Sequence, residues 1–449
     1  MSGKVGDNVF RASGLVKAAA AGRTGTVDWC TTAKTSPLTA ESGKGYFVNT
    51  TCGAITVTLP ASPTAGDIVS LKDYAETWDS NAVTLARNSS KIGGMCFDAT
   101  LSTEGQSITM VYVDGTQGWE NIQTDTSVKG NEYLTATGGT IVTCGDYKTH
   151  IFTGDGCFAV SKVGVTAPNN VVDYLVVAGG GSGGSGGAPS YMSGGGGGGG
   201  FRVFSTAPGS NSPLNNSGAS PNTEVTVTAT TYPITIGGGG AAASADNTKG
   251  CAGTVSTFST VTSAGGGFGA AGGGTPEAGG PGGSGGGSSQ GQAGGTGNDP
   301  PVSPAQGQDG GVGDAGNNNS GGGGGGAGAT GGPSPGPNVG GPGADGSYIA
   351  ESFIGPTSGS YGTPGPVSVT RYFAGGGGAP SNGPSAPAAP TGGAGGGGDG
   401  GPGGNPGGVD AGAGTTNTGG GGGGGAFDPP GGVPGAGGSG FVAIRYKYQ

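Results

Sequence analysis

The sequence predicts an all-β protein in which a β-sandwich precedes a large glycine-rich domain, and three observations support this fold class. Short runs that alternate apolar and polar residues recur before residue 179, as half-buried strands do. Glycine is concentrated in the remaining 271 residues, which hold 95 of the 116 glycines. That part contains a single leucine, Leu214, and glycine costs roughly 1 kcal/mol at a helical position, so stable helices are not expected there.

The first 24 residues are predicted to be a docking segment. Their charges are interleaved with single apolar residues, and they lack the apolar stretch of roughly 7–15 residues that marks a secretory signal. Their larger apolar side chains are too few for a core of their own: Val9, Phe10, Leu15 and Val16. We therefore expect residues 1–24 to attach to another protein, and we expect export by a route such as lysis if the protein acts outside the cell that makes it.

Residues 25–125 are predicted to form an antiparallel β-sandwich. Ile55, Val57 and Leu59 alternate with threonines and are followed by Pro60, which indicates a half-buried strand that ends at the proline. Similar runs, separated by turn-forming residues, lie at 46–48, 68–71, 82–85 and 107–113. Because a small sandwich leaves edge strands that need covering, we expect this domain to assemble as a homotrimer.

Residues 126–134 are predicted to be a linker, after which strand patterns resume. Apolar runs at 150–153 and 157–160 flank a Gly-Asp-Gly turn and predict a β-hairpin, with His150 as a surface or capping side chain at its start. Residues 171–178 form an apolar run of the kind found in strands that are buried on both faces.

The stretch at residues 179–439 admits several interpretations. A combined proline and glycine content above about 25–30%, without a regular sequence repeat, is typical of disorder. Collagen and a calcium β-roll are excluded, because neither Gly-X-Y nor G-G-x-G-x-D units repeat. Short β-like segments interrupt the glycine runs, and residues 440–449 have the pattern of a strand, which needs a sheet to pair with. We therefore expect an ordered domain at 135–449, with a β-sheet base formed by 135–178 and 440–449 and a large insertion at 179–439.

The glycine runs are predicted to order as polyproline-II-like helices packed side by side. This helix has three residues per turn and a rise of about 3.1 Å, and its N–H and C=O groups point outward. Without side chains, neighbouring helices approach closely enough to hydrogen-bond in several directions, which offsets the entropic cost of ordering glycine. The run at 194–200 would then span roughly 22 Å, with bulkier residues at the loops and on the surface of the bundle.

Composition disfavours several classes of function. The 17 Lys and Arg residues against 27 Asp and Glu give a net charge of −10, which repels phosphate backbones and argues against a nucleic-acid partner. Membrane insertion is not expected, because no run of about 18 bulky apolar residues occurs. His150 is the single histidine, and the six cysteines are widely spaced without a C-x-x-C pair, so we expect small buried thiols, no metal and no cofactor. We expect that the protein is not an enzyme.

Two parts of the sequence resemble proteins of marine bacteriophages. A β-domain of tail-fibre proteins, including those of cyanophages, is similar to this chain at residues 45–50, 58–60, 104–107 and 118–119. The glycine-rich domain of such proteins is similar to it at residues 173–181, 372–376 and 438–446. Together the two resemblances cover most of residues 25–449, and by looser analogy the second extends to the polyglycine tip adhesins of T-even-like phages.

The resemblance implies a virion tail fibre that is made in the host cytoplasm and released by lysis. Residues 1–24 would bind other tail or baseplate proteins, and the glycine-rich domain would present loops to a host receptor, either a glycan or an outer-membrane protein. The receptor-binding candidates are large side chains among small polar residues, since tyrosine supplies rigid amphipathic contact area. They are Tyr191, Met192, Tyr348, Phe353, Tyr361 and Phe427.

Two alternatives to this interpretation remain. If the candidate side chains only cover the edge of the bundle, the protein is a purely structural fibre or decoration protein without a receptor role. The other alternative is a polysaccharide-degrading tailspike, but it needs two carboxylates held close together. The acidic residues after position 178 are scattered along the chain.

Overall fold

The computed structural model describes residues 27–448 except for 126–132, 165–166, 188–190, 210–211, 216–222, 316–319, 382–388, 403–408 and 427–431. The expected docking segment at 1–24 and most of the expected linker lie outside the described residues. The chain divides into two compact units, Met1–Gly130 and Asn131–Gln449. Strands dominate both units, so the expected all-β fold class is confirmed.

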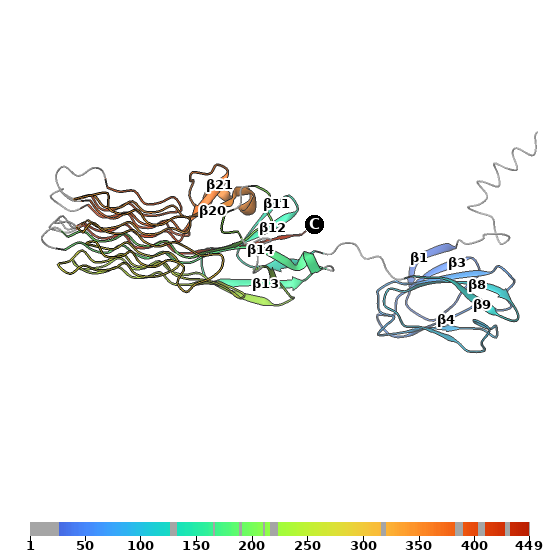
Figure 1. The fold of residues 1–449 in the computed structure, drawn as a ribbon. Helices are drawn as coiled ribbons and strands as arrows, with labels where there is room; N and C mark the ends of the chain where they lie inside the picture. The colour runs from blue at the N-terminus through green and yellow to red at the C-terminus, as the bar shows by residue number, and fades with distance from the viewer. Residues whose placement is uncertain are drawn as a thin grey trace, which may run out of the picture. The chain divides into compact units, whose positions relative to one another are not determined.

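The first unit is a sandwich of two sheets (Figure 1). The five-stranded sheet contains, in spatial order, β1 (Asp28–Lys34), β3 (Lys44–Val48), β5 (Ile68–Asp73), β8 (Ser107–Asp114) and β9 (Gly118–Asp125). The four-stranded sheet contains β2 (Leu38–Thr39), β4 (Ile55–Thr58), β6 (Val83–Ala86) and β7 (Ala99–Leu101). Ile55, Val57 and Leu59 all lie in the core between the sheets, as their alternation predicts.

The first unit is a β-sandwich as expected, but its sheets are mixed rather than antiparallel, with antiparallel pairing among the described strands confined to β5–β8, β8–β9 and β6–β7. Strands β1, β3 and β5 pair in parallel, and so do β2, β4 and β6. The reason is the path of the chain, which crosses to the opposite sheet after each of its first five strands and therefore returns to each sheet in the same direction. An alternation of period two is the same in both kinds of sheet, so it does not reveal this path.

The base of the second unit also consists of two sheets. The larger contains β11 (Thr140–Cys144), β12 (Tyr147–Phe152), β22 (Phe441–Lys447), β14 (Val171–Val177) and β15 (Phe201–Phe204), with β16 (Val225–Thr226) paired to β14. The other contains β10 (Thr135–Thr137), β13 (Gly156–Lys162), β17 (Thr231–Thr235), β18 (Ser256–Phe258) and β19 (Val261–Ser263). A further pair, β20 (Ser347–Ala350) and β21 (Thr370–Phe373), flanks the short helix α2 (Glu351–Ile354).

The last strand closes this base, as expected. β22 lies between β12 and β14 and pairs antiparallel with both. Val442 and Ile444 pack into the core between the two sheets, whereas Phe441 and Ala443 pack on the opposite face with Phe353 of α2. The strand is therefore buried on both faces, as expected also for β14.

The expected hairpin at residues 150–160 is wrong. β12 and β13 belong to different sheets, so the turn between them carries the chain across the core rather than back along its neighbour. His150 consequently faces this core and is fully buried, and it is not the surface side chain that its place near a turn predicts. The expected buried thiols are wrong as well, since five of the six cysteines are exposed and Cys30 is half-buried.

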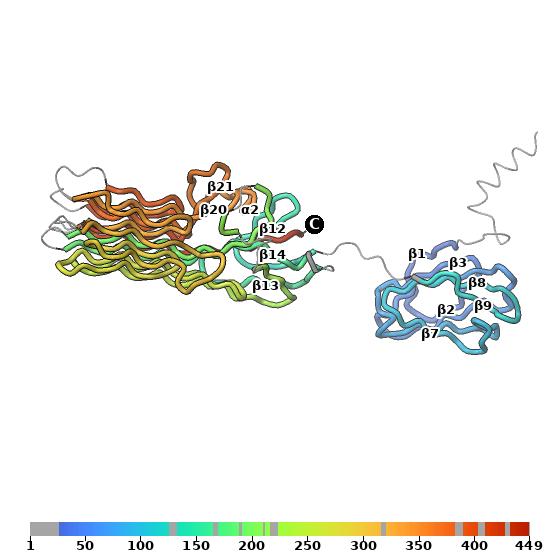
Figure 2. Tube along the Cα trace, in the orientation of Figure 1, coloured from blue at the N-terminus to red at the C-terminus, as the bar shows by residue number. Residues whose placement is uncertain are grey.

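Beyond the base, the glycine-rich stretch runs back and forth as extended segments that lie side by side (Figure 2). Hydrogen bonds join segments that are distant in sequence, such as Gly196 with Gly422 and Gly195 with Gly322. The chain turns at one end near the sheets and at the other end away from them (Figure 1). The ordered bundle expected from the glycine runs is confirmed.

Candidate binding surfaces of the glycine-rich unit

The run at residues 194–200 lies at the centre of the bundle and shows how the bundle is held together. Gly194, Gly197 and Gly200 donate backbone hydrogen bonds of 3.0, 2.8 and 2.7 Å to one neighbouring segment, at Ala270, Gly267 and Ala264. The glycines between them donate to two other segments, at Gly322, Gly325, Gly419 and Gly422. The partner thus repeats every third residue, as expected of a helix with three residues per turn whose polar groups point outward.

The carbonyl groups of the same run bind three more segments. They accept hydrogen bonds from Ala178, Gly181, Gly184, Ser284, Gly287 and Gly377. The central run is therefore bonded to six described segments, three through its N–H groups and three through its C=O groups. The N–H and C=O groups in these hydrogen bonds are therefore satisfied by other parts of the protein and need no water. This stabilises the bundle, because a buried polar group without a partner costs about 1–3 kcal/mol.

This arrangement leaves no room for a side chain on the central glycines, and the buried side chains beside them are small, as at Ser182 and Ser284. A Cβ atom on Gly197 would lie 2.3 Å from the carbonyl oxygen of Ser284 and 2.7 Å from that of Gly285. Glycine is needed here for close approach of the backbones rather than for an unusual φ angle. Side chains that could recognise a partner are consequently confined to the outer faces and the two ends of the bundle.

At the end away from the sheets, three residues with half-buried or exposed side chains lie beside Gly272 and Gly273. Gly187 and Tyr191 exchange two backbone hydrogen bonds of 3.1 and 2.9 Å, which places Tyr191 at the start of the returning segment. The Gln290 amide donates to the carbonyl oxygen of Gly273, and a Cβ on Gly273 would touch the Asn247 amide. Tyr191, Asn247 and Gln290, which we call the far-end cluster, therefore combine a phenol with two side-chain amides.

The far-end cluster is held by tight turns. Asn247 and Gln290 have φ angles of 53° and 50°, in the left-handed region that non-glycine residues seldom adopt. Beside them the Lys249 ammonium lies 4.8 Å from the centre of the Phe268 ring. Tyr191 is among the residues that the sequence predicts for binding, but the two amides are not, because only the folded bundle brings them together.

Two other candidates lie at the sheet end. Tyr348 is half-buried with its ring 5.2 Å from that of Tyr372, and Tyr361 is half-buried with its ring 5.4 Å from that of Phe441. Both phenols thus cover the base of the bundle. They are separated from Tyr191 by the length of the glycine runs, so the candidates do not form one site.

Met192 and Phe353 leave the set of receptor-binding candidates. Both side chains are fully buried, with 0% of their surface exposed, so neither is available to a partner. Phe353 instead packs on β22, and its carbonyl oxygen accepts a hydrogen bond of 2.8 Å from the Thr149 hydroxyl. Phe427 lies outside the described residues.

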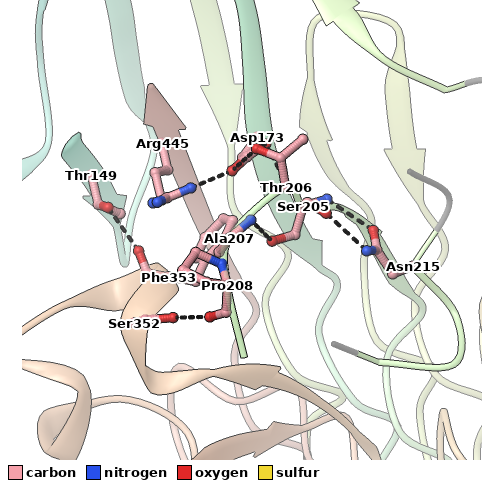
Figure 3. Close-up of polar contacts among 10 residues, drawn as sticks. All are labelled: Thr149, Asp173, Ser205, Thr206, Ala207, Pro208, Asn215, Ser352, Phe353 and Arg445. Carbon is pink, nitrogen blue, oxygen red and sulfur yellow. Dashed lines mark hydrogen bonds and ion pairs between the residues drawn. The ribbon is translucent and has the colours of Figure 1, made fainter. Parts of the chain in front are cut away.

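A buried ion pair joins the last strand to the rest of the base (Figure 3). Asp173 and Arg445 are direct cross-strand partners on β14 and β22, and Nη1 of Arg445 lies 2.5 Å from Oδ2 of Asp173. The backbone N–H and hydroxyl of Thr206 also donate to Asp173, while the guanidinium lies 3.6 Å from the centre of the Tyr147 ring. Burial raises the pKa of the Asp173 carboxyl, and Arg445 and Thr206 oppose that rise.

The network around this ion pair anchors loops. Ser205 exchanges hydrogen bonds of 2.8 and 2.9 Å with the Asn215 side chain, and the Ser352 hydroxyl donates to the carbonyl oxygen of Pro208 (Figure 3). These contacts tie the segment after β15 to α2. We interpret the network as a structural element that fixes the register of the terminal strand, a role that sequence patterns did not reveal.

His150 forms a second buried polar network in the core of the base. Its Nδ1–H donates to the carbonyl oxygen of Gly138 over 2.7 Å, since a carbonyl can only accept, and its Nε2 lies 3.2 Å from the Tyr446 hydroxyl. The Tyr446 hydroxyl also accepts from the N–H of Ala136. Burial lowers the pKa of His150, Lys148 adds to that effect, and the Gly138 carbonyl opposes it.

Neither a metal cluster nor a membrane helix is found in the described part of the chain. No group of three or more His, Cys, Asp or Glu side chains is positioned to hold a metal ion there. Among the same residues, no helix has the length and apolar character needed to cross a bilayer.

Comparison with known proteins identifies one family. Residues 157–447 match the model of a family described as a glycine-rich domain. The match begins in β13 and ends at the last residue of β22, so it includes the whole bundle and the strand that closes its base. No curated protein matches the chain.

Proposed function

Since this chain belongs to the glycine-rich domain family, we propose that its bundle is a rigid scaffold that presents side chains at its ends to a receptor, and that the protein is a non-catalytic attachment protein. The observation that carries the proposal is the six-neighbour hydrogen bonding of residues 194–200. A scaffold built in this way admits only glycine and small buried side chains around its central run, so any recognition must use its surface. Because the ends are preorganised, binding would cost little ordering entropy.

The far-end cluster is the part of the bundle best suited to such a role. A tyrosine contributes rigid amphipathic contact area, and side-chain amides contribute donors and acceptors that adapt to a polar partner. Tyr191, Asn247 and Gln290 supply this combination beside Gly272 and Gly273. Tyr348 and Tyr361 at the sheet end are the second choice, because each already packs against another aromatic ring.

The more specific proposal is a bacteriophage tail fibre. In this proposal the protein is part of a virion, assembles as a homotrimer, and attaches to other tail or baseplate proteins through residues 1–24. The receptor is a glycan or an outer-membrane protein of the host cell. Its support is the resemblance of residues 45–50, 58–60, 173–181 and 438–446 to such proteins, together with the membership of the glycine-rich domain family.

Binding of the purified, fluorescently labelled full-length protein to a panel of marine bacterial cells, cyanobacteria included, tests the proposal. The wild-type protein should bind saturably to some strains, and the double variant Tyr191→Ala/Asn247→Ala should bind roughly tenfold more weakly. Tyr348→Ala is the matched control, because it removes a half-buried tyrosine at the opposite end of the bundle.

Each other outcome has a definite meaning. No saturable binding to any strain would contradict an attachment role and favour a purely structural fibre or decoration protein. Loss of binding with Tyr348→Ala alone would move the contact surface to the sheet end. Release of reducing sugars from cell-surface polysaccharide would contradict the non-catalytic proposal and indicate a tailspike.

A further inference from the structure

We propose that the first unit carries a separate binding site for a neutral saccharide, in a groove beside strands β3 and β5. This proposal goes beyond the function proposed above, since it concerns the β-sandwich and not the glycine bundle. The groove is defined by Thr31, Phe47, Lys72, Asp73, Tyr74, Ala75 and Glu76, and its volume is about 580 Å³. That volume falls within the range of roughly 300–1,000 Å³ that is typical of small-molecule sites.

Two aromatic rings, those of Phe47 and Tyr74, line the groove, and the Trp29 ring packs against Phe47. The ring centres of Trp29 and Phe47 are 5.0 Å apart, and those of Phe47 and Tyr74 are 6.5 Å apart. Trp29 and Tyr74 expose 43% and 57% of their surface to solvent. We call Trp29, Phe47 and Tyr74 the aromatic wall. Large aromatic surfaces that stay in contact with water in this way indicate an interaction site more often than a stabilising core.

The backbone is adapted to hold these rings. Gly45 lies directly opposite Trp29 in the parallel pair β1–β3, and a Cβ on Gly45 would lie 2.6 Å from the indole. The absence of a side chain there lets the indole lie on the strand next to Phe47. Phe47 itself lies opposite Lys72 on β5, and the Lys72 ammonium donates a hydrogen bond to the carbonyl oxygen of Gly105.

The loop that supplies Tyr74 and Glu76 is fixed from below. The Asp73 carboxylate, which is 2% exposed, accepts backbone hydrogen bonds of 3.3, 3.2 and 3.0 Å from Thr77, Trp78 and Gly105. Glu76 has a φ of 56°, which is unusual for a residue that is not glycine. Backbone strain of this kind, held in place by the hydrogen bonds of a buried carboxylate, is found most often at functional sites.

The lining chemistry favours a sugar over other ligands. A pyranose ring presents apolar C–H groups on its faces, which stack on aromatic rings, and hydroxyl groups on its rim, which bind charged and polar side chains. Lys72, Glu76 and the Thr31 hydroxyl supply such side chains around the aromatic wall. One ammonium balanced by carboxylates does not select for a phosphate or a polyanion, so we assign the groove to a neutral saccharide.

A second copy of the chain is a poorer occupant. Lysine and glutamate are depleted at the core of protein–protein interfaces, whereas here they line the groove beside its rings. A homotrimer would more readily use the sheet edges, which carry unpaired backbone groups.

The tryptophans of the full-length protein provide a direct assay. The chain has three, of which Trp78 and Trp119 are fully buried, so quenching by acrylamide reports on Trp29. Binding is first located on an array of neutral and acidic glycans, and the neutral oligosaccharide with the strongest signal is then titrated. It should protect Trp29 from quenching, and Tyr74→Ala should weaken its binding by roughly tenfold or more. Phe97→Ala is the control, since Phe97 is a 75% exposed aromatic of the same unit outside the groove.

Several results would overturn the proposal. They are no binding to any neutral glycan on the array, binding that Tyr74→Ala leaves unchanged, and equal loss with Phe97→Ala. Binding restricted to acidic glycans would also contradict it. If Tyr74→Ala dissociates an oligomer in sedimentation analysis without changing glycan binding, the aromatic wall is an interface between copies. These variants leave the glycine bundle intact, so the outcome is independent of the cell-binding test of the far-end cluster.

Discussion

The spacing inside the glycine bundle leads to a sharp prediction about Gly197. Replacing it by alanine would place a methyl group 2.3 Å from the carbonyl oxygen of Ser284, about 1 Å closer than ordinary contacts allow. The neighbouring segment must then move, which disturbs the 3.0 Å hydrogen bond from Ser284 to Gly198 and the 2.8 Å bond from Gly267 to Ser284.

The expected magnitude follows from these two effects. Overpacking costs about 1–3 kcal/mol, and each buried backbone group left unpaired costs about 1–3 kcal/mol more. We therefore expect Gly197→Ala to lower the free energy of unfolding of the glycine-rich unit by roughly 3–5 kcal/mol. Gly197→Val adds bulk at the same place and should be worse. In thermal unfolding, the change for alanine corresponds to a drop in Tm on the order of 5–10 °C.

A glycine in the same kind of run provides the matched control. A Cβ on Gly238 would meet only the Thr254 hydroxyl, at 3.8 Å, whereas its neighbours Gly237, Gly239 and Gly240 would clash with carbonyl oxygens at 2.0, 1.9 and 2.0 Å. Gly238→Ala should therefore change the Tm little, while Gly239→Ala should behave like Gly197→Ala. Equal Tm values for Gly197→Ala, Gly238→Ala and the wild type would refute close packing of the bundle.

Two further predictions concern the base. Burial lowers the pKa of His150 from its ordinary value of 6.5, so the unfolded chain binds a proton more readily than the folded one, and the free energy of unfolding should decline as the pH falls below about 6.5. In urea unfolding at several pH values, His150→Gln should flatten that decline. An unchanged pH dependence in this variant would contradict the prediction. Arg445→Met should lower the free energy of unfolding by about 3–5 kcal/mol, because it leaves Asp173 buried without its cation. The double variant Asp173→Asn/Arg445→Met should recover most of this free energy. If urea unfolding finds the double variant no more stable than Arg445→Met, the ion pair is excluded as the cause.

Local pattern predicted the elements of this chain better than their pairing. The alternation of Ile55, Val57 and Leu59 identified β4 and its buried face, but it carries no information on whether the next strand joins the same sheet. The same limit explains the wrong hairpin, since the turn after β12 looks alike whether the chain reverses within a sheet or crosses between two.

The bundle was predictable because its physics is local. Glycine without a side chain allows one dense packing of extended helices, and the three-residue repeat of that helix decides which groups meet. Single functional side chains are a different matter. Asp173 and Arg445 are 272 residues apart, and Asn247 joins Tyr191 only through the folding of separate runs, so neither association leaves a signal in a short window.

The hydrogen bonding around residues 194–200 has a consequence for how this domain tolerates changes in length. Its partners repeat every third residue and involve backbone groups alone, so they specify phase but almost no sequence. Inserting three glycines into a run turns it once and returns each N–H group to the segment it faced before. Inserting one or two rotates the rest of the run by a third or two thirds of a turn and misdirects every donor. Lengths of related bundles should therefore differ by triplets within runs, while their turns vary freely.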